Sequence, residues 1–255
     1  MADDNNEWPR EPGFRGFYTD YGPITSSTRK IVEPSTGAVI RYSVSRNQWD
    51  ERSPRIRRIR AYATLPQNRA PACWMRFDLL DDGGQELDDS ELWYACDAMS
   101  ASLERLASAL IEATGSGVTD VFDLGPVLHF ERLEVHQELR GTGLGVLLAQ
   151  AVLAEFVNRF KPSLLLLCPY PLQFENCAPG ESSDSKRQTR FKRALDTNRR
   201  KLARLYEREF GVVRLCKGGD YWATALPGFR LMQSKPGWAV WYDHRETAVS
   251  TTACV

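Results

Sequence analysis

The sequence is poor in the residues that would hold a metal ion. It contains only three histidines, none in an H-E-x-x-H arrangement, and its six cysteines include no C-x-x-C pair. Several of these cysteines lie inside apolar segments, which is typical of buried thiols in a reducing compartment rather than of a disulfide framework. We therefore expect no metal cofactor and a cytoplasmic location.

Long apolar runs and a net charge are absent as well. No stretch approaches the ~20 apolar residues of a membrane span. The 33 basic residues are balanced by 33 acidic ones, so the chain has no overall attraction to nucleic acid or to anionic membranes. The segment Met1 to Glu7 is acidic and polar, unlike a signal or transit peptide. With 255 residues the chain can form one large or two small domains, and we expect no membrane partner, although an oligomer is possible.

What the sequence does contain is a glycine-rich turn, Arg140 to Gly145, between a predicted strand over residues 127–135 and a predicted helix over residues 144–160. The helix is predicted from apolar residues at three- and four-residue spacing: Leu144, Leu147, Leu148, Ala151, Val152 and Phe156. The first N–H groups of a helix have no intrahelical acceptor, and glycines let an anion approach them. The turn is therefore suited to phosphate, unless it is a turn that binds nothing.

The spacing of the glycines discriminates between known phosphate-binding turns. The dinucleotide pattern G-x-G-x-x-G fails because its third glycine would fall on Val146, and the P-loop fails because no Gly-Lys-Ser/Thr follows. The pattern that fits is Arg-x-x-Gly-x-Gly, as Arg140-Gly141-Thr142-Gly143-Leu144-Gly145, preceded by Leu133-Glu134-Val135. This segment resembles the acyl-CoA pyrophosphate loop of the GNAT family of N-acetyltransferases.

The resemblance covers roughly residues 55–226 and implies a fold and a co-substrate. The implied fold is α/β (α+β layered), with a mixed, mostly antiparallel central sheet that is flanked by helices and splayed at the acyl-CoA cleft. The implied co-substrate is acetyl-CoA. The residues expected to contact it are Leu133, Val135, Arg140, Gly141, Thr142, Gly143, Leu144 and Gly145. Residues 1–54 are expected to form an irregular N-terminal extension with short strands, and residues 227–255 a C-terminal strand and tail on the same domain.

Other segments add elements to this domain. Alternating apolar residues predict strands over residues 55–65 and 72–80, the second ending in a hairpin-type turn at residues 81–84. Residues 91–113 read as one long helix capped by Asp89 or Ser90, which departs from the usual family order. Further strands are predicted over residues 38–44, 164–168, 212–217, 221–226 and 237–242.

The region from Ser185 to Phe210 is helical in pattern and strongly basic. Between Lys186 and Arg204 it has nine Lys or Arg and one acidic residue. The favoured interpretation is that these charges lie on a solvated helix face. The alternatives are contact with the 3′-phosphate of CoA or with an RNA backbone. Asp196 or Thr197 could start a second helix midway.

The resemblance also implies the chemistry. Members of the GNAT family commonly carry a Tyr on their last helix that can protonate the departing thiolate. Tyr206 is the matching residue here. The match is imperfect, because Gly211 comes one position later than usual and Val212 replaces an aromatic residue. The backbone N–H of Val135 is expected to support the thioester carbonyl.

A general base, where one exists, would lie on the strand that enters the loop. Strict alternation over residues 127–135 places His129, Glu131 and Leu133 on one face. Glu131 is therefore the first candidate and His129 the second, while the alternative is a chain of waters with no dedicated base.

Two classes of function follow. The first is an acetyl-CoA-dependent N-acetyltransferase that transfers the acetyl group to a primary amine by direct attack in a ternary complex. The second is a non-catalytic acyl-CoA-binding or regulatory module on the same fold. For the enzyme, a small-molecule or peptide amine is favoured as acceptor over tRNA, because the net charge is zero and no recognised RNA-binding motif is present.

Overall fold

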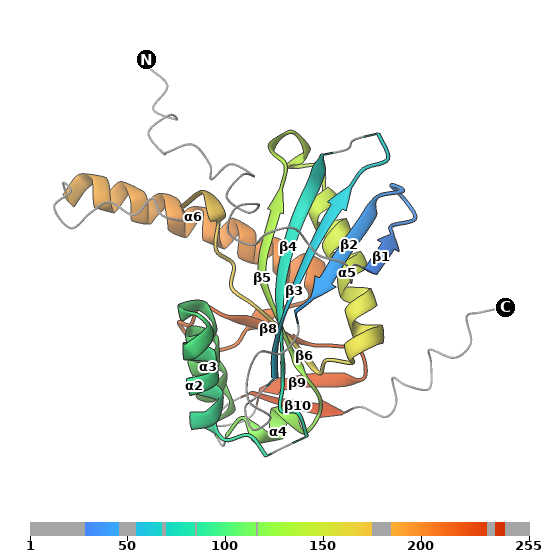
Figure 1. The fold of residues 1–255 in the computed structure, drawn as a ribbon. Coiled ribbons are helices and arrows are strands. Elements are labelled where there is room, and N and C mark those ends of the chain that lie inside the picture. Colours follow the sequence, from blue (N-terminus) through green and yellow to red (C-terminus); the bar gives the residue numbers. More distant parts are fainter. Residues whose placement is uncertain are drawn as a thin grey trace.

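An eight-stranded sheet forms the centre of the protein (Figure 1). The computed structural model describes residues 29–45, 55–67, 70–84, 86–115, 117–174, 185–233 and 238–242. The strand order is β1-β2-β3-β4-β5-β6-β8-β7, in which β5 and β6 are parallel and the other neighbours are antiparallel. The predicted mixed, mostly antiparallel sheet flanked by helices is confirmed.

The strands of the large sheet are β1 (Arg29–Val32), β2 (Val39–Val44), β3 (Arg55–Thr64), β4 (Pro71–Asp81), β5 (Val127–Val135), β6 (Leu164–Leu167), β7 (Val213–Arg214) and β8 (Trp222–Ala225). A separate hairpin consists of β9 (Phe229–Gln233) and β10 (Trp238–Tyr242). Because β2 pairs with β3 along its whole length, the segment before residue 54 contributes two strands to the central sheet. The domain boundaries at residues 54 and 226 stay a prediction.

Helices cover both faces of the sheet. One face packs against α5 (Leu144–Phe160) and the C-terminal part of α6 (Ser185–Phe210). The other packs against α2 (Asp89–Met99), α3 (Ala101–Thr114), α4 (Thr119–Phe122) and the β9–β10 hairpin. Two short 3₁₀ helices, η2 (Gln137–Leu139) and η3 (Leu172–Phe174), follow β5 and β6. Burying both faces stabilises the sheet and explains why β6 is apolar throughout.

The single helix predicted over residues 91–113 is wrong, because Ser100 divides it into α2 and α3. Ser100 has an extended backbone, and its Oγ accepts a hydrogen bond from Leu103 N at 3.3 Å, so it caps α3 instead of continuing α2. The cap of α2 is Asp88, in a reciprocal capping box with Glu91, and neither Asp89 nor Ser90. The turn at residues 81–84 leads into α2 and not into a hairpin.

The basic region forms one continuous helix of 26 residues, so no second helix begins at Asp196 or Thr197. Thr197 Oγ1 donates to Arg193 O at 2.8 Å, and Asn198 Nδ2 donates to Ala194 O at 2.9 Å. These side chains bond to the preceding turn and do not interrupt it. The N-terminal half of α6 extends beyond the edge of the sheet (Figure 1). In the described part of the chain, no helix combines the length and hydropathy needed to cross a membrane.

Candidate functional site

The parallel strands β5 and β6 separate halfway along β5. They pair only over Val127–Phe130, opposite Leu164–Leu167, and the remaining residues of β5 pair with β4 alone within the described residues. A cavity of about 590 Å³ lies where the strands part. It is lined by the second half of β5, the glycine-rich loop, the segment after β6 and one face of α6. This volume is typical of a site for a small molecule or a cofactor.

The register of β5 turns two of its peptide groups toward the cavity. His136 N donates to Ala72 O at 2.9 Å, which makes Cys73 and Val135 a non-hydrogen-bonded pair. The N–H and C=O of Val135 therefore point away from β4, and those of Leu133, two residues earlier, point the same way. Val135 O accepts a hydrogen bond from Arg140 Nε at 2.9 Å. The N–H groups of Leu133 and Val135 are thus available to a ligand.

The glycine-rich loop presents backbone amides to the same cavity. Gly141 and Gly143 have positive φ angles of 74° and 81°, and nothing lies within 4 Å of where a Cβ would stand on either. Gly143 is the N-cap of α5 and has no side chain to cap it, and the one first-turn amide with a side-chain acceptor among the described residues is Leu144 N, which donates to Thr142 Oγ1 at 3.4 Å. The first-turn amides of Gly145 and Val146 therefore face the cavity without an intrahelical acceptor. Together with the helix dipole they favour an anion.

Gly145 has a different role from the other two glycines. A Cβ at this position would lie 2.5 Å from Val135 Cγ2. The absence of a side chain therefore lets the start of α5 pack directly against β5, which brings the loop amides next to the exposed edge of that strand.

The remaining residues of the predicted loop set differ in placement. The side chain of Arg140 holds the carbonyl of Val135, and Arg140 also lines the cavity. Thr142 and Leu144 are not among the lining residues. Thr142 Oγ1 donates to Leu139 O at 2.7 Å, and Leu144 packs into the core at 9% exposure. These two residues shape the loop from within.

One face of α6 forms the opposite wall of the cavity. Its lining residues are Asn198, Lys201, Leu202, Leu205, Tyr206 and Arg208, at helical three- and four-residue spacing. Only Tyr206 among them was predicted to take part in the chemistry, although the helical spacing of Leu202, Leu205 and Tyr206 indicates a shared apolar face. The chain after β6 also lines the cavity, with Cys168, Tyr170, Pro171 and Leu172.

Tyr206 lies at the base of this wall. Its side chain is 8% exposed, and its ring packs 6.4 Å from that of Phe130 and 5.6 Å from that of Phe210. Burial, with a smaller contribution from the neighbouring Cys168, raises the pKa of the phenol above its ordinary value. The phenol therefore keeps its proton at neutral pH.

A β-bulge in β5 corrects the predicted alternation of its side chains. Arg132 lies opposite Arg76, but Phe130 lies opposite Phe77. Glu131 is therefore an additional residue whose backbone has no opposite residue in the register of β4. Beyond the bulge the faces exchange, and Leu133 packs with the same core cluster as Phe130. The prediction that Leu133 shares a face with His129 and Glu131 is therefore wrong.

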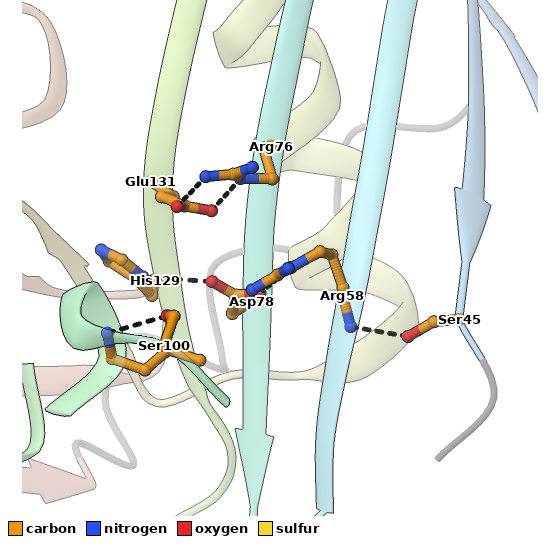
Figure 2. A network of polar contacts seen from close by, with 8 residues as sticks. Ser45, Arg58, Arg76, Asp78, Ser100, His129 and Glu131 are labelled. Carbon is orange, nitrogen blue, oxygen red and sulfur yellow. Dashed lines mark hydrogen bonds and ion pairs between the residues drawn. The ribbon is translucent and has the colours of Figure 1, made fainter. Parts of the chain in front are cut away.

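The two candidate bases lie in different surroundings (Figure 2). Glu131 lines the cavity, where Arg76 engages both of its carboxylate oxygens in an ion pair whose side chains are each 11% exposed. His129 is 1% exposed and is not among the lining residues. Of the three predicted catalytic residues, Tyr206 and Glu131 therefore both line the cavity and His129 does not.

His129 belongs to a buried polar cluster on the face covered by α2 and α3. Its Nδ1 lies 3.4 Å from Asp78 Oδ2 without hydrogen-bond alignment, and Arg58 Nε lies 2.9 Å from Asp78 Oδ1 (Figure 2). Burial alone would raise the pKa of Asp78, but His129 and Arg58 together bring it below its ordinary value. Asp78 therefore stays ionised inside the sheet. Among the described residues, no three His, Cys, Asp or Glu side chains gather in a way that could hold a metal ion.

Comparison with known proteins gives limited similarity. No family model and no curated protein matches the chain. Among solved structures, it is similar to the apo form of an agmatine N-acetyltransferase variant, with 15% identity and a TM-score of 0.36 over 66% of this chain and 76% of the other. It is also similar to the Drosophila melanogaster polyamine N-acetyltransferase, an enzyme that forms N-acetylagmatine, with 15% identity and a TM-score of 0.33 over 66% and 74%. The functional assignment therefore rests on the geometry of the cavity.

Proposed function

We propose that this protein is an acetyl-CoA-dependent N-acetyltransferase of the GNAT type. The observation that carries the proposal is a convergence in one cavity. The outward amides of the glycine-rich loop, the unpaired edge of β5 and the buried phenol of Tyr206 all line the same space. These groups correspond to the three needs of acyl transfer from a thioester: a site for the pyrophosphate, donors for an oxyanion and an acid for the thiolate.

In this proposal the loop holds the pyrophosphate. The amides of Gly145 and Val146 donate to phosphate oxygens at the positive end of α5. Arg140 and Lys201, which line the cavity from opposite sides, supply positive charge there. The pantetheine arm then extends along the exposed edge of β5 toward Tyr206.

The transfer is a direct attack in a ternary complex. The amine nitrogen forms a bond to the thioester carbon, and the N–H of Val135 donates a hydrogen bond to the oxygen as it gains charge. When the C–S bond breaks, Tyr206 gives its proton to the thiolate. The proton lost by the amine passes to Glu131 or to water. Arg76 engages one side of the Glu131 carboxylate. The lone pairs on the other sides of the carboxylate are left for a water or the amine.

We propose a small-molecule or peptide amine as the acceptor. The cavity of about 590 Å³ suits the thioester arm together with a small group or the end of a peptide. The domain assignment to residues 55–226 and the cytoplasmic location belong to the same proposal. The described cysteines Cys73, Cys96, Cys168 and Cys216 are free thiols, which fits a reducing compartment.

A second candidate is a non-catalytic acyl-CoA-binding module. The observation that favours it is the engagement of both Glu131 oxygens by Arg76, which reduces the access of a substrate to this carboxylate. The two candidates differ in one measurable property. The enzyme releases CoA thiol from acetyl-CoA when an amine is added, and the binding module does not.

The test of the proposal combines calorimetric titration of CoA with thiol release over a panel of amines, peptides and aminoacyl-tRNA. Gly143→Asp places a negative charge and a Cβ in the anion cradle, so we expect CoA binding to fall by at least ~100-fold. Gly84→Asp is the matched control, because Gly84 also has a positive φ, 78°, and open space around a Cβ, but lies outside the cavity. Unchanged CoA binding in Gly143→Asp would contradict the site. CoA binding without thiol release on any amine would favour the binding module.

A further inference from the structure

One side of α6 carries a straight row of cations. Lys186, Arg190, Arg193, Arg200 and Arg204 follow one another at spacings of three, four or seven residues, which keeps them on one side of the helix. All five are exposed. From Lys186 to Arg204 the row is about 27 Å long at the rise of an α-helix. We call these five residues the basic row.

Four of the five cations of the basic row are unpaired within the part of the chain that the structure describes. Arg190, Arg193, Arg200 and Arg204 form no ion pair with any described residue. At its C-terminal end the row reaches a second cavity of about 440 Å³, where Arg200 and Arg204 are joined by Arg214, whose guanidinium lies 5.3 Å from the ring centre of Trp222. The acids at this cavity are Asp196, Glu207 and Asp220, and Asp220 pairs with Arg199.

The N-terminal half of this arrangement costs helix stability. Lys186–Arg190 and Arg190–Arg193 are like charges four and three residues apart, which repel by about 0.2–0.5 kcal/mol per pair in isolated helices, and no acid lies between them in the sequence. Farther along, Asp196 and Glu207 stand three or four residues from the cations of the row and offset this repulsion. In addition, α6 has no acid in its first turn and begins with basic residues, which opposes the helix dipole. A face selected only for solubility would mix the two signs along its whole length, whereas residues 185–195 contain no acid. A bound polyanion would remove both penalties.

We propose that the basic row binds the phosphate backbone of a nucleic acid. Neighbouring positions of the row stand about 5–6 Å apart where the spacing is three or four residues, so consecutive cations can meet consecutive phosphates of a strand. The 3′-phosphate of CoA would engage one or two of these cations, whereas a row of this length matches several phosphates. Contacts between cations and phosphates carry no sequence information, so we expect the binding to be independent of base sequence and dominated by counterion release.

This site is separate from the proposed acetyl-transfer cavity. None of the five residues of the basic row lines that cavity. The inference therefore does not depend on the proposed function, and the two can be tested on the same proteins with different readouts.

The test is fluorescence anisotropy with a labelled RNA hairpin at 50 to 200 mM salt, using the full chain. We expect binding at low salt that weakens steeply as salt rises. In Arg190→Glu combined with Arg193→Glu, we expect at least ~10-fold weaker binding and a log–log salt slope smaller by about 1 for each cation removed. The matched control is Arg29→Glu combined with Lys30→Glu, two exposed cations of β1 at the far edge of the sheet. It makes the same change in net charge and should bind as the wild type does.

Three results would overturn the inference: absence of RNA binding at 50 mM salt, equal loss of binding in the two double variants, or binding without salt dependence. Vesicles containing anionic lipid form a parallel arm, and binding to vesicles but not to RNA would also overturn it. CoA titration of the same variants keeps the two proposals apart. Loss of RNA binding with unchanged CoA binding is the expected result for Arg190→Glu with Arg193→Glu.

Discussion

Tyr206 is the residue on which the proposed acid step depends. Replacing it with Phe removes the hydroxyl and keeps the ring that packs on Phe130 and Phe210. We expect Tyr206→Phe to lower kcat by about 10²-fold, the typical contribution of a general acid, while the affinity for CoA stays almost unchanged. Thiol release and calorimetric titration measure the two effects separately.

The control for this variant is Tyr221→Phe. Tyr221 is also largely buried, and its hydroxyl donates to Ser102 O at 2.8 Å, but it lies outside the cavity. It should lose about 1 kcal/mol of stability for the missing hydrogen bond and retain its activity. Equal kcat values in wild type and Tyr206→Phe would reduce Tyr206 to a packing residue.

Asp78 is a second residue with a measurable role, in stability rather than in catalysis. Asp78→Asn leaves the guanidinium of Arg58 without its charged partner beneath α2 and α3, so we expect a loss of about 3–5 kcal/mol in the free energy of unfolding. Asp81→Asn is the control, because the Arg57–Asp81 pair is 30% and 23% exposed and should contribute less than about 1 kcal/mol. Similar losses in the two variants, measured by urea unfolding, would contradict the importance of burial.

At this scale the sequence identified the cavity residues that belong to a local pattern. The loop glycines and Tyr206 could be found because short motifs mark them. The orientation of Glu131 could not, because it depends on a bulge in the pairing of β5 with Arg76 and Phe77, which lie more than 50 residues earlier. The ion pair between Arg76 and Glu131 was missed for the same reason.

Among the elements, the contact of α5 with β5 sets the position of the loop. Gly145→Ala gains helix propensity, worth up to about 1 kcal/mol, but its Cβ meets the stiff side chain of Val135 at 2.5 Å. We expect the clash to dominate, with a net loss of about 1 kcal/mol and weaker CoA binding as α5 moves away from β5. Urea unfolding and calorimetry measure both effects.

A double variant tests the stated cause. Val135→Ala removes Cγ2, so the combination of Gly145→Ala with Val135→Ala should be more stable than the sum of the single effects predicts. Strict additivity would show that the loss in Gly145→Ala comes from elsewhere.

Elements with a regular apolar pattern were predicted well. The helix over residues 144–160 and the strand over residues 127–135 have the expected bounds, because their patterns are long and uninterrupted. The break at Ser100 was missed because the apolar spacing continues across it, and the decision rests on one side-chain hydrogen bond. The role of α6 as a cavity wall was not predicted, because the spacing within one helix does not show which distant strand its apolar face meets.

For the molecule as a whole, stability should depend on pH through carboxyls with lowered pKa values. The pKa of Asp78 is lowered by His129 and Arg58, and the pKa of Glu33 is lowered to about 2 by hydrogen bonds from Thr36 and Ser35. A carboxyl whose folded pKa lies below its unfolded value, about 4, stabilises the fold above that pH and loses this effect as pH falls through the folded value. We expect the contribution of Asp78 to the free energy of unfolding to be constant near neutral pH and to decline below about pH 4.

The measurement is urea unfolding of the wild type and Asp78→Asn between pH 7 and pH 2. The difference between the two proteins should narrow as pH falls below about 4, since the Asp78 carboxyl of the unfolded chain takes up a proton there before that of the folded protein does. A difference that stays the same down to pH 2 would contradict the lowered pKa of Asp78.

The order of strands in the sheet was beyond the sequence. The pattern of each strand shows which face it buries, but the insertion of β8 between β6 and β7 depends on pairing between residues that are far apart in the chain. The incorporation of β1 and β2 into the central sheet has the same origin.

Among the residues that the structure describes, those that line the cavity all lie between Phe130 and Arg208. As the polypeptide leaves the ribosome, both walls of the cavity are synthesised before β8, β9 and β10. Until β8 arrives, the free edge of β6 is uncovered, and until Val240 arrives part of the apolar face beneath α2, α3 and α4 is exposed. A nascent chain that stalls after α6 would therefore carry all the residues that line the cavity on a sheet with an open edge, the form most exposed to wrong pairing with another chain.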